Sequence, residues 1–183
     1  MKIITGQYGG RRFDPPRSLQ ARPTTDLAKQ ALFNILQCRM SFEGCRALDF
    51  FSGTGSISFE LLSRGAAHVV SVEQGRPQQQ FIQKVAEQLK VPRNRHQLVR
   101  GDVFRYLATP PATPFDLIFA DPPYALPDLD KLPDLVLRDG WLANEGLFVL
   151  EHGKDSDFSS HPHFQELRTY GAVHFSFFQL PVP

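Results

Sequence analysis

The sequence predicts an α/β protein with a doubly wound, mostly parallel sheet and helices on both faces. From residue 46 onward, short β-prone runs alternate with amphipathic helical segments, and repeated strand–helix units of this kind form parallel sheets with right-handed crossovers. Residues 115–120 form an apolar run typical of a fully buried parallel strand. A turn containing two glycines, residues 52–55, follows the first predicted strand, as at the ligand-binding edge of such sheets.

Local patterns predict the individual elements. Apolar residues at helical spacing predict helices over 27–37, 57–62, 76–90 and 129–137, with a short helix after residue 102. The β-prone runs predict strands at 46–51, 68–72, 97–99, 115–120, 146–150, 167–169 and 173–180. We expect residues 1–183 to form a single domain, because a chain of this length can bury one core.

Residues 1–40 form a basic N-terminal extension of this domain. Residues 2–12 are typical of a β-hairpin, and a helix begins near Thr24 or Thr25, either of which can cap it. Residues 1–46 carry five more basic than acidic side chains, whereas the rest of the chain is acidic on balance. This excess favours contact with phosphates. Arg22 is also placed to pair with Asp26 or to reach a cofactor, and these alternatives stay open.

Composition excludes several classes of protein. No apolar run approaches the roughly 20 residues that a membrane-spanning helix needs. The N-terminus lacks the apolar core and small-residue cleavage site of a signal peptide. Two cysteines, Cys38 and Cys45, are too few for a zinc site. We therefore expect a cytoplasmic monomer with reduced thiols, no metal and no membrane association.

The turn after the first strand is a candidate cofactor site. Its glycines let the backbone approach a ligand closely, and the helix that follows offers free N–H groups. An aspartate at the end of the strand stands immediately before the turn. The residues assigned here to cofactor binding are Asp49, Ser52, Gly53, Thr54 and Gly55.

Two further acids end the next two strands. Glu73 lies about 20 residues beyond the glycine turn, where an acid accepts ribose hydroxyls. Asp102, followed by Val103, is placed to contact the amino group of adenine. A dinucleotide site would have a third glycine where this chain has Ser58. Asp49 would also repel a phosphate bound at this turn. S-adenosylmethionine carries adenine, ribose and an amino group but no phosphate, so the acids favour it over a nicotinamide cofactor.

The predicted strand 115–120 ends in Asp121-Pro122-Pro123-Tyr124. The prolines cannot donate hydrogen bonds to a sheet and they fix φ, so the chain leaves the sheet in a stiff loop. An acid, rigid carbonyls and an aromatic ring therefore stand at the edge where α/β proteins bind ligands. We assign these four residues to catalysis.

These motifs resemble a known family. Residues 49–55 and 121–124 resemble the amino methyltransferases, which use S-adenosylmethionine to modify exocyclic nitrogens of bases. Over essentially the whole chain, further motifs are similar to the bacterial 16S ribosomal RNA (guanine-N2)-methyltransferase family; they lie at 3–12, 22–26, 31–36 and 62–66. The resemblance implies a Rossmann-like methyltransferase fold and methyl transfer to N2 of a guanine in 16S ribosomal RNA, free or in the small ribosomal subunit. The residues that would hold RNA phosphates are Lys2, Arg11, Arg12, Arg17 and Arg22.

The same resemblance implies roles within the acceptor site. Asp121 and the Pro122 carbonyl would accept the two N–H bonds of the guanine amine, while Tyr124 would stack on the base. Other acceptors stay open, namely adenine N6, cytosine N4 and a protein glutamine, as does a non-catalytic RNA-binding assembly factor. His152 follows the fifth strand, but we assign it no role, because a partly exposed histidine is the commoner case.

Overall fold

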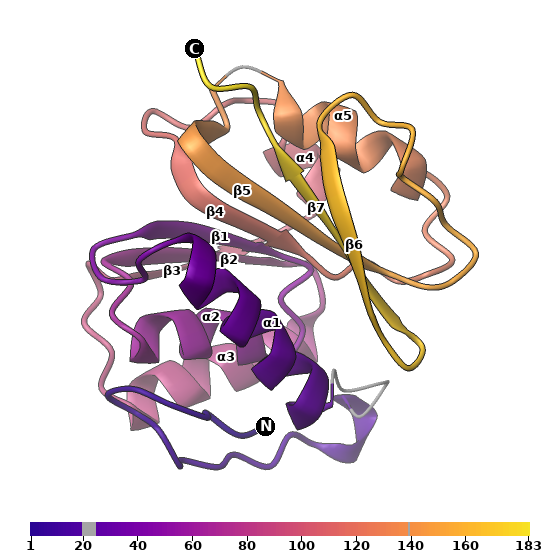
Figure 1. Ribbon diagram of the computed structural model, residues 1–183. Coiled ribbons are helices and arrows are strands. Elements are labelled where there is room, and N and C mark those ends of the chain that lie inside the picture. Colours follow the sequence, from indigo (N-terminus) through magenta and orange to yellow (C-terminus); the bar gives the residue numbers. More distant parts are fainter. Residues whose placement is uncertain (20–24, 139) are drawn as a thin grey trace.

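The computed structural model describes residues 1–19, 25–138 and 140–183 (Figure 1). The described chain forms a seven-stranded sheet with the order β3-β2-β1-β4-β5-β7-β6. Among its pairings, only those of β7 with β5 and with β6 are antiparallel. The predicted mostly parallel sheet is confirmed. The strands are β1 (Arg46–Phe50), β2 (His68–Glu73), β3 (His96–Arg100), β4 (Phe115–Ala120), β5 (Leu142–His152), β6 (Phe164–Tyr170) and β7 (Val173–Gln179).

Helices cover both faces of the sheet. Figure 1 shows α1, α2 and α3 on one side and α4 and α5 on the other. Because successive strand side chains point to opposite faces, Ala47 and Leu117 pack into one core cluster and Leu48 and Ile118 into the other. The helices are α1 (Asp26–Arg39), α2 (Ser56–Ser63), α3 (Arg76–Gln88), α4 (Val103–Tyr106) and α5 (Leu132–Leu137), with the 3-10 turns η1 (Arg17–Leu19) and η2 (Leu129–Lys131).

The winding direction reverses between β1 and β4. The strands β2 and β3 lie on one side of β1, and β4 to β7 lie on the other. Both neighbours of β1 run parallel to it, and Phe50 at its end is the register partner of Ala120 at the end of β4. The loops that leave β1 and β4 therefore start side by side, at the kind of crevice where α/β sheets bind ligands.

Some predicted boundaries were wrong for local backbone reasons. The strand β5 begins at Leu142, before the predicted start, and its register with β4 shifts between Phe115 and Leu117. Glu145, in this irregular stretch, has a φ of 64°, so the side chains there do not alternate in a way that periodicity detects. The predicted helix 129–137 is divided into η2 and α5.

The first part of the N-terminal extension, residues 1–19, lies on the outside of the helical layer formed by α1, α2 and α3 (Figure 1). The predicted hairpin is reduced, in the described residues, to a ribbon with a single antiparallel bridge between Lys2 and Arg12. The ribbon is held by Glu60 of α2, a fully buried acid that accepts hydrogen bonds from the N–H groups of Ile4 (2.7 Å) and Thr5 (3.1 Å). The extension is therefore anchored to the sheet domain rather than loosely attached.

Glu60 also forms an ion pair with Lys29 of α1, whose Nζ lies 3.1 Å from Oε1. Both side chains are buried, and burial lowers the pKa of Lys29. Removing one partner of a buried pair leaves the other charge uncompensated. One carboxylate thus holds α1, α2 and the N-terminal ribbon together.

We predict that Glu60→Ala lowers the free energy of unfolding by about 3–5 kcal/mol, measured by urea denaturation, because the buried charge of Lys29 is left without its carboxylate partner. The matched control is Asp128→Ala, which breaks an exposed pair with Lys131 and should change stability little. Equal effects of the two substitutions would contradict the anchoring role of Glu60.

Candidate functional site

The glycine turn after β1 is tied to the end of β2 by Glu73. The N–H groups of Gly53 and Gly75 donate to Oε2 and Oε1 of Glu73 at 2.8 and 2.9 Å. A carboxylate oxygen carries two lone pairs, so each oxygen can still accept a hydroxyl of a ligand. The structure thus brings Glu73 to the glycine turn, as the sequence predicted.

The backbone is left-handed at two positions of the glycine turn and at the residue just before it. Phe51, Gly53 and Gly55 have φ angles of 56°, 57° and 78°. A Cβ atom at Gly55 would lie 2.8 Å from the ring of Phe59, so this glycine is needed for the start of α2. A Cβ atom at Gly53 would meet only Phe51 O, 4.0 Å away. The backbone at Gly53 is therefore open to a ligand.

Asp49 lies beneath this turn and is only 1% exposed. Its Oδ2 accepts hydrogen bonds from the N–H (3.2 Å) and the hydroxyl (2.6 Å) of Ser58. Burial raises the pKa of Asp49 to about 7; the nearby carboxylates of Asp121 and Glu73 add to the increase, and the bonds from Ser58 oppose it. A cation bound beside Asp49 would favour its ionised form.

The tetrapeptide 121–124 begins next to the end of β1. The N–H of Asp121 donates to Phe50 O at 3.3 Å, which extends the pairing of β1 with β4 by one residue. Pro122 is buried, while Asp121 and Tyr124 are half-buried. The predicted acceptor residues and the predicted cofactor turn thus share one edge of the sheet.

Comparison with known proteins identifies the family. Residues 1–179 match the family described as Conserved hypothetical protein 95. Ribosomal RNA small subunit methyltransferase D of Escherichia coli (strain K12) is 36% identical over 151 residues, which cover 82% of this chain and 74% of that protein. The Haemophilus influenzae protein of the same name is 30% identical over 182 residues, covering 98% and 93%.

A solved structure agrees with this match. The Escherichia coli protein yhhF superposes with a TM-score of 0.85 at 30% identity, covering 100% of this chain and 99% of that one. The chain belongs to this methyltransferase family. It is an enzyme, a methyltransferase, as the sequence predicted, and the methyl donor that the sequence predicts for it is S-adenosylmethionine.

The residues at the ends of β1 and β2 fit this methyl donor. Asp49 and Glu73 place carboxylates at the turn, and residues 51–56 contain no lysine or arginine that would meet a phosphate. The open backbone at Gly53 allows close approach. A cofactor with cationic and hydroxyl groups and no phosphate suits this set of donors and acceptors.

Other residues assigned to cofactor binding have structural contacts of their own. The hydroxyl of Ser52 donates to Asp49 O at 2.7 Å and so fixes the turn. Asp102 is exposed and caps α4, because its Oδ1 accepts from the N–H of Arg105 at 3.0 Å. Val103 is buried in the core, and Thr54 is half-buried. Ligand contacts by these four residues stay predictions.

Sequence reasoning missed Gly153, which positions Tyr124. A Cβ atom at Gly153 would lie 2.7 Å from Cδ2 of the Tyr124 ring, so the ring packs directly on the backbone that follows β5. The φ of Gly153 is not left-handed, so close approach is the reason for glycine here. The available signal was a glycine just beyond a predicted strand end.

The expectation that His152 is partly exposed was wrong. His152 is only 1% exposed. Its Nδ1 lies 2.8 Å from Gly153 O, and its Nε2 lies 2.7 Å from the hydroxyl of Ser176. A carbonyl can only accept, so Nδ1 carries the proton and Nε2 accepts from Ser176. Both ring nitrogens are engaged, and His152 serves the packing behind Tyr124.

The predicted phosphate-binding residues lie on the N-terminal extension. Arg11, Arg12 and Arg17 are exposed, and Lys2 is half-buried. The Arg11 guanidinium lies 5.6 Å from the centre of the Phe13 ring. Arg22 lies outside the described residues.

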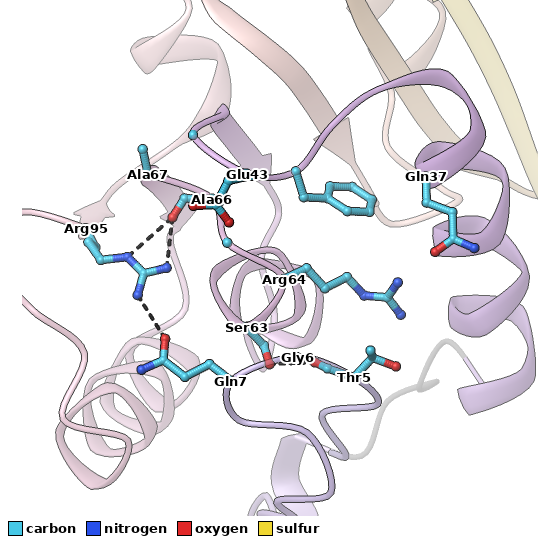
Figure 2. A pocket seen from close by; sticks show the side chains of 13 residues that line it. Thr5, Gly6, Gln7, Gln37, Glu43, Ser63, Arg64, Ala66, Ala67 and Arg95 are labelled. Carbon is cyan, nitrogen blue, oxygen red and sulfur yellow. Dashed lines mark hydrogen bonds between the residues drawn. The ribbon is translucent and has the colours of Figure 1, made fainter.

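A cavity of about 610 Å³ lies at the opposite end of the sheet, among the segments that lead into β1 and β2 (Figure 2). Figure 2 shows Arg95 donating to Ala66 O (2.9 Å) and to Gln7 Oε1 (3.3 Å). A Cβ atom at Gly6 would lie 2.0 Å from Ser63 O, so the turn of the ribbon packs tightly against the end of α2. These groups fasten the ribbon to α2, and we assign them no catalytic role.

Among residues 1–19, 25–138 and 140–183, no three His, Cys, Asp or Glu side chains are grouped so that they could hold a metal ion. In the same described ranges, no helix has the length and apolar character to cross a membrane.

We predict that Asp49→Asn makes the cofactor-free protein more stable at pH 8. The pKa of Asp49 rises from its ordinary value of 3.8 to about 7 on folding, so the folded state binds more protons than the unfolded state at pH values between these two. The free energy of unfolding therefore falls, by on the order of a few kcal/mol, as the pH rises from the lower of these values to the higher. Asparagine cannot ionise and removes this loss.

Urea denaturation at pH 5 and pH 8 measures the effect. The matched control is the exposed Asp102→Asn, because asparagine caps a helix as well as aspartate does. A wild-type protein that is more stable than Asp49→Asn at pH 8 would contradict the assigned environment of Asp49.

Proposed function

We propose that the protein transfers a methyl group from S-adenosylmethionine to the exocyclic N2 of a guanine in 16S ribosomal RNA of the small ribosomal subunit. The observation that carries the proposal is the position of Asp121-Pro122-Pro123-Tyr124 beside the glycine turn of β1. The relatives named as small-subunit ribosomal RNA methyltransferases support ribosomal RNA as the substrate. The choice of guanine N2 rests on the N-terminal motifs.

The residues that bind the methyl acceptor make its exocyclic amine a better nucleophile. The lone pair of an exocyclic amine is delocalised into the ring, so the amine attacks poorly. The Asp121 carboxylate and the Pro122 carbonyl accept one N–H bond each, which favours a pyramidal nitrogen with an exposed lone pair. Tyr124 stacks on the base and sets the angle of attack. Bound S-adenosylmethionine supplies the methyl group.

Positioning of the reactants and removal of a proton both contribute to methyl transfer. Holding the two reactants in line can lower the barrier by about 7–11 kcal/mol at most. The amine becomes acidic only after it is methylated, so Asp121 takes the proton late, as a general base. The target base must leave its stack or loop to reach Asp121.

The remaining residues bind the two substrates. Asp49 holds the amino group of the methyl donor, Glu73 holds the ribose hydroxyls, and Asp102 with Val103 contacts adenine. The backbone of the turn completes this site through Ser52, Gly53, Thr54 and Gly55. The residues proposed to hold RNA phosphates are Lys2, Arg11, Arg12, Arg17 and Arg22, all within residues 1–40. We further propose that the enzyme is a single-domain cytoplasmic monomer that needs no metal.

Radiolabelled methyl transfer tests the proposal. Naked 16S ribosomal RNA and small subunits from a strain lacking the gene are incubated with the enzyme and labelled S-adenosylmethionine, and the nucleosides are then separated. We expect the label in N2-methylguanosine. Label in N6-methyladenosine or N4-methylcytosine would show that the acceptor is adenine N6 or cytosine N4 instead of guanine N2. A lack of transfer to either substrate would overturn the proposal.

We predict that Asp121→Ala lowers the rate of methyl transfer by roughly 10²–10⁴-fold, because it removes both an acceptor for the amine and the general base. Cofactor affinity, measured by calorimetry, should change little. The control is Asp155→Ala at an exposed position after β5. Transfer by Asp121→Ala at near the wild-type rate would show that Asp121 has another role.

We predict that the double charge reversal Arg11→Glu and Arg12→Glu weakens RNA binding and flattens its salt dependence. Each lost phosphate contact reduces the slope of log affinity against log salt by about 0.7–0.9. The matched control reverses Lys90 and Arg93, two exposed residues after α3. An unchanged slope in the Arg11/Arg12 variant would exclude the ribbon as an RNA contact.

A further inference from the structure

Behind Asp49, three side chains form a continuous chain of hydrogen bonds. The Ser58 hydroxyl donates to Asp49 Oδ2 at 2.6 Å, and the hydroxyls of Ser58 and Ser71 lie 2.7 Å apart. The hydroxyl of Ser71 lies 2.9 Å from His96 Nε2. The chain therefore runs from β1 through α2 and β2 to β3. Ser58 and Ser71 are fully buried, so water does not replace these bonds.

The order of donors in this chain is determined by its acid end. An ionised Asp49 can only accept, so the single proton of Ser58 points to Asp49. Ser58 must then accept from Ser71, and Ser71 must accept from His96. An ionised Asp49 thus requires the tautomer of His96 that carries its proton on Nε2. Hydrogen bonds aligned in this way strengthen one another.

We propose that Ser58, Ser71 and His96 act as a positioning relay that holds Asp49 ionised and oriented for the cationic amino group of S-adenosylmethionine. The inference rests on the proposed role of Asp49 in the cofactor site. Ser58 is the first member, and Ser71 and His96 support it from the neighbouring strands. None of the three is required to touch the cofactor.

Electrostatics at Asp49 shows why a relay is needed. Asp49 is buried, and Asp121, which follows β4, and Glu73, at the end of β2, lie near it with charge of the same sign. These groups disfavour its ionised form, whereas the bonds from Ser58 favour it. Burial, assisted by the nearby His68, lowers the pKa of His96 to about 4. His96 therefore donates its proton as a neutral group.

The relay also gives a physical reason for serine at position 58. Glycine at this position would leave Asp49 Oδ2 without its hydroxyl donor, although the backbone N–H would remain. Ser71 lies in the interior of a buried strand. Among the described residues, its hydroxyl forms hydrogen bonds with Ser58 and His96. Two buried hydroxyls beside a histidine cost free energy of folding unless each of these polar groups forms hydrogen bonds.

Calorimetric binding of two ligands tests the relay. S-adenosylhomocysteine carries the amino group that Asp49 would hold, and 5′-methylthioadenosine lacks it. We expect Ser71→Ala and His96→Phe to weaken S-adenosylhomocysteine binding at pH 7 by about tenfold, the equivalent of one hydrogen bond to a charged group. Binding of 5′-methylthioadenosine should be unchanged. The loss should diminish at higher pH, where Asp49 ionises without help.

Conservative variants separate positioning from packing. A glutamine at position 96 can place an N–H where Nε2 stands, so His96→Gln should restore binding that His96→Phe loses. The control is His68→Gln, since His68 lies near His96 but bonds to Asn94 O instead. Thermal unfolding identifies any variant that fails to fold, and Ser71→Ala and His96→Phe provide independent tests.

Nitrogen NMR of His96 gives a readout that does not depend on activity. With S-adenosylhomocysteine bound, we expect the proton of His96 on Nε2. A proton on Nδ1 alone, or equal loss of both ligands in the variants, would overturn the relay. If Asp49→Asn leaves S-adenosylhomocysteine binding unchanged, the proposed role of Asp49 fails; if it weakens binding while Ser71→Ala and His96→Phe do not, only the relay fails.

Discussion

The parallel pairing of β1 with β4 is the constraint on which the site depends. It places Phe50 beside Ala120, so the two loops that follow start at adjacent points. The hydrogen bond from Asp121 N to Phe50 O carries this pairing into the loop itself. Because the chain reverses its winding direction between these strands, the helices that follow them, α2 and α5, lie on opposite faces of the sheet, and a crevice forms between the two loops. A methyl donor and a methyl acceptor can therefore meet there.

The second feature of the site is its negative charge. Asp49, Glu73 and Asp121 lie close enough that the latter two raise the pKa of Asp49. Such a cluster is costly in the absence of a cation and is well matched to a cofactor that carries one. The backbone N–H groups of Gly53 and Gly75 hold Glu73, while Ser58 holds Asp49. The protein thus stabilises Glu73 and Asp49 through neutral donors and leaves positive charge to the ligand.

Much of the fold and site could be predicted because it depends on local signals. The buried run ending at Asp121, the glycines after β1 and the acid at Glu73 each have a short-range meaning in a parallel sheet. The contacts of Glu60 with the ribbon, of Gly153 with Tyr124, and of Ser71 with His96 join segments distant in the sequence. No periodicity encodes such pairs, so only the three-dimensional structure reveals them.

A crystal structure with bound S-adenosylhomocysteine tests the central claim most directly. We predict its amino group within hydrogen-bonding distance of Asp49, its ribose hydroxyls on Glu73, and its sulfur facing Asp121 across the gap between β1 and β4. A ligand seated elsewhere, for example in the cavity beside Arg95, or a sulfur turned away from Asp121, would contradict the account.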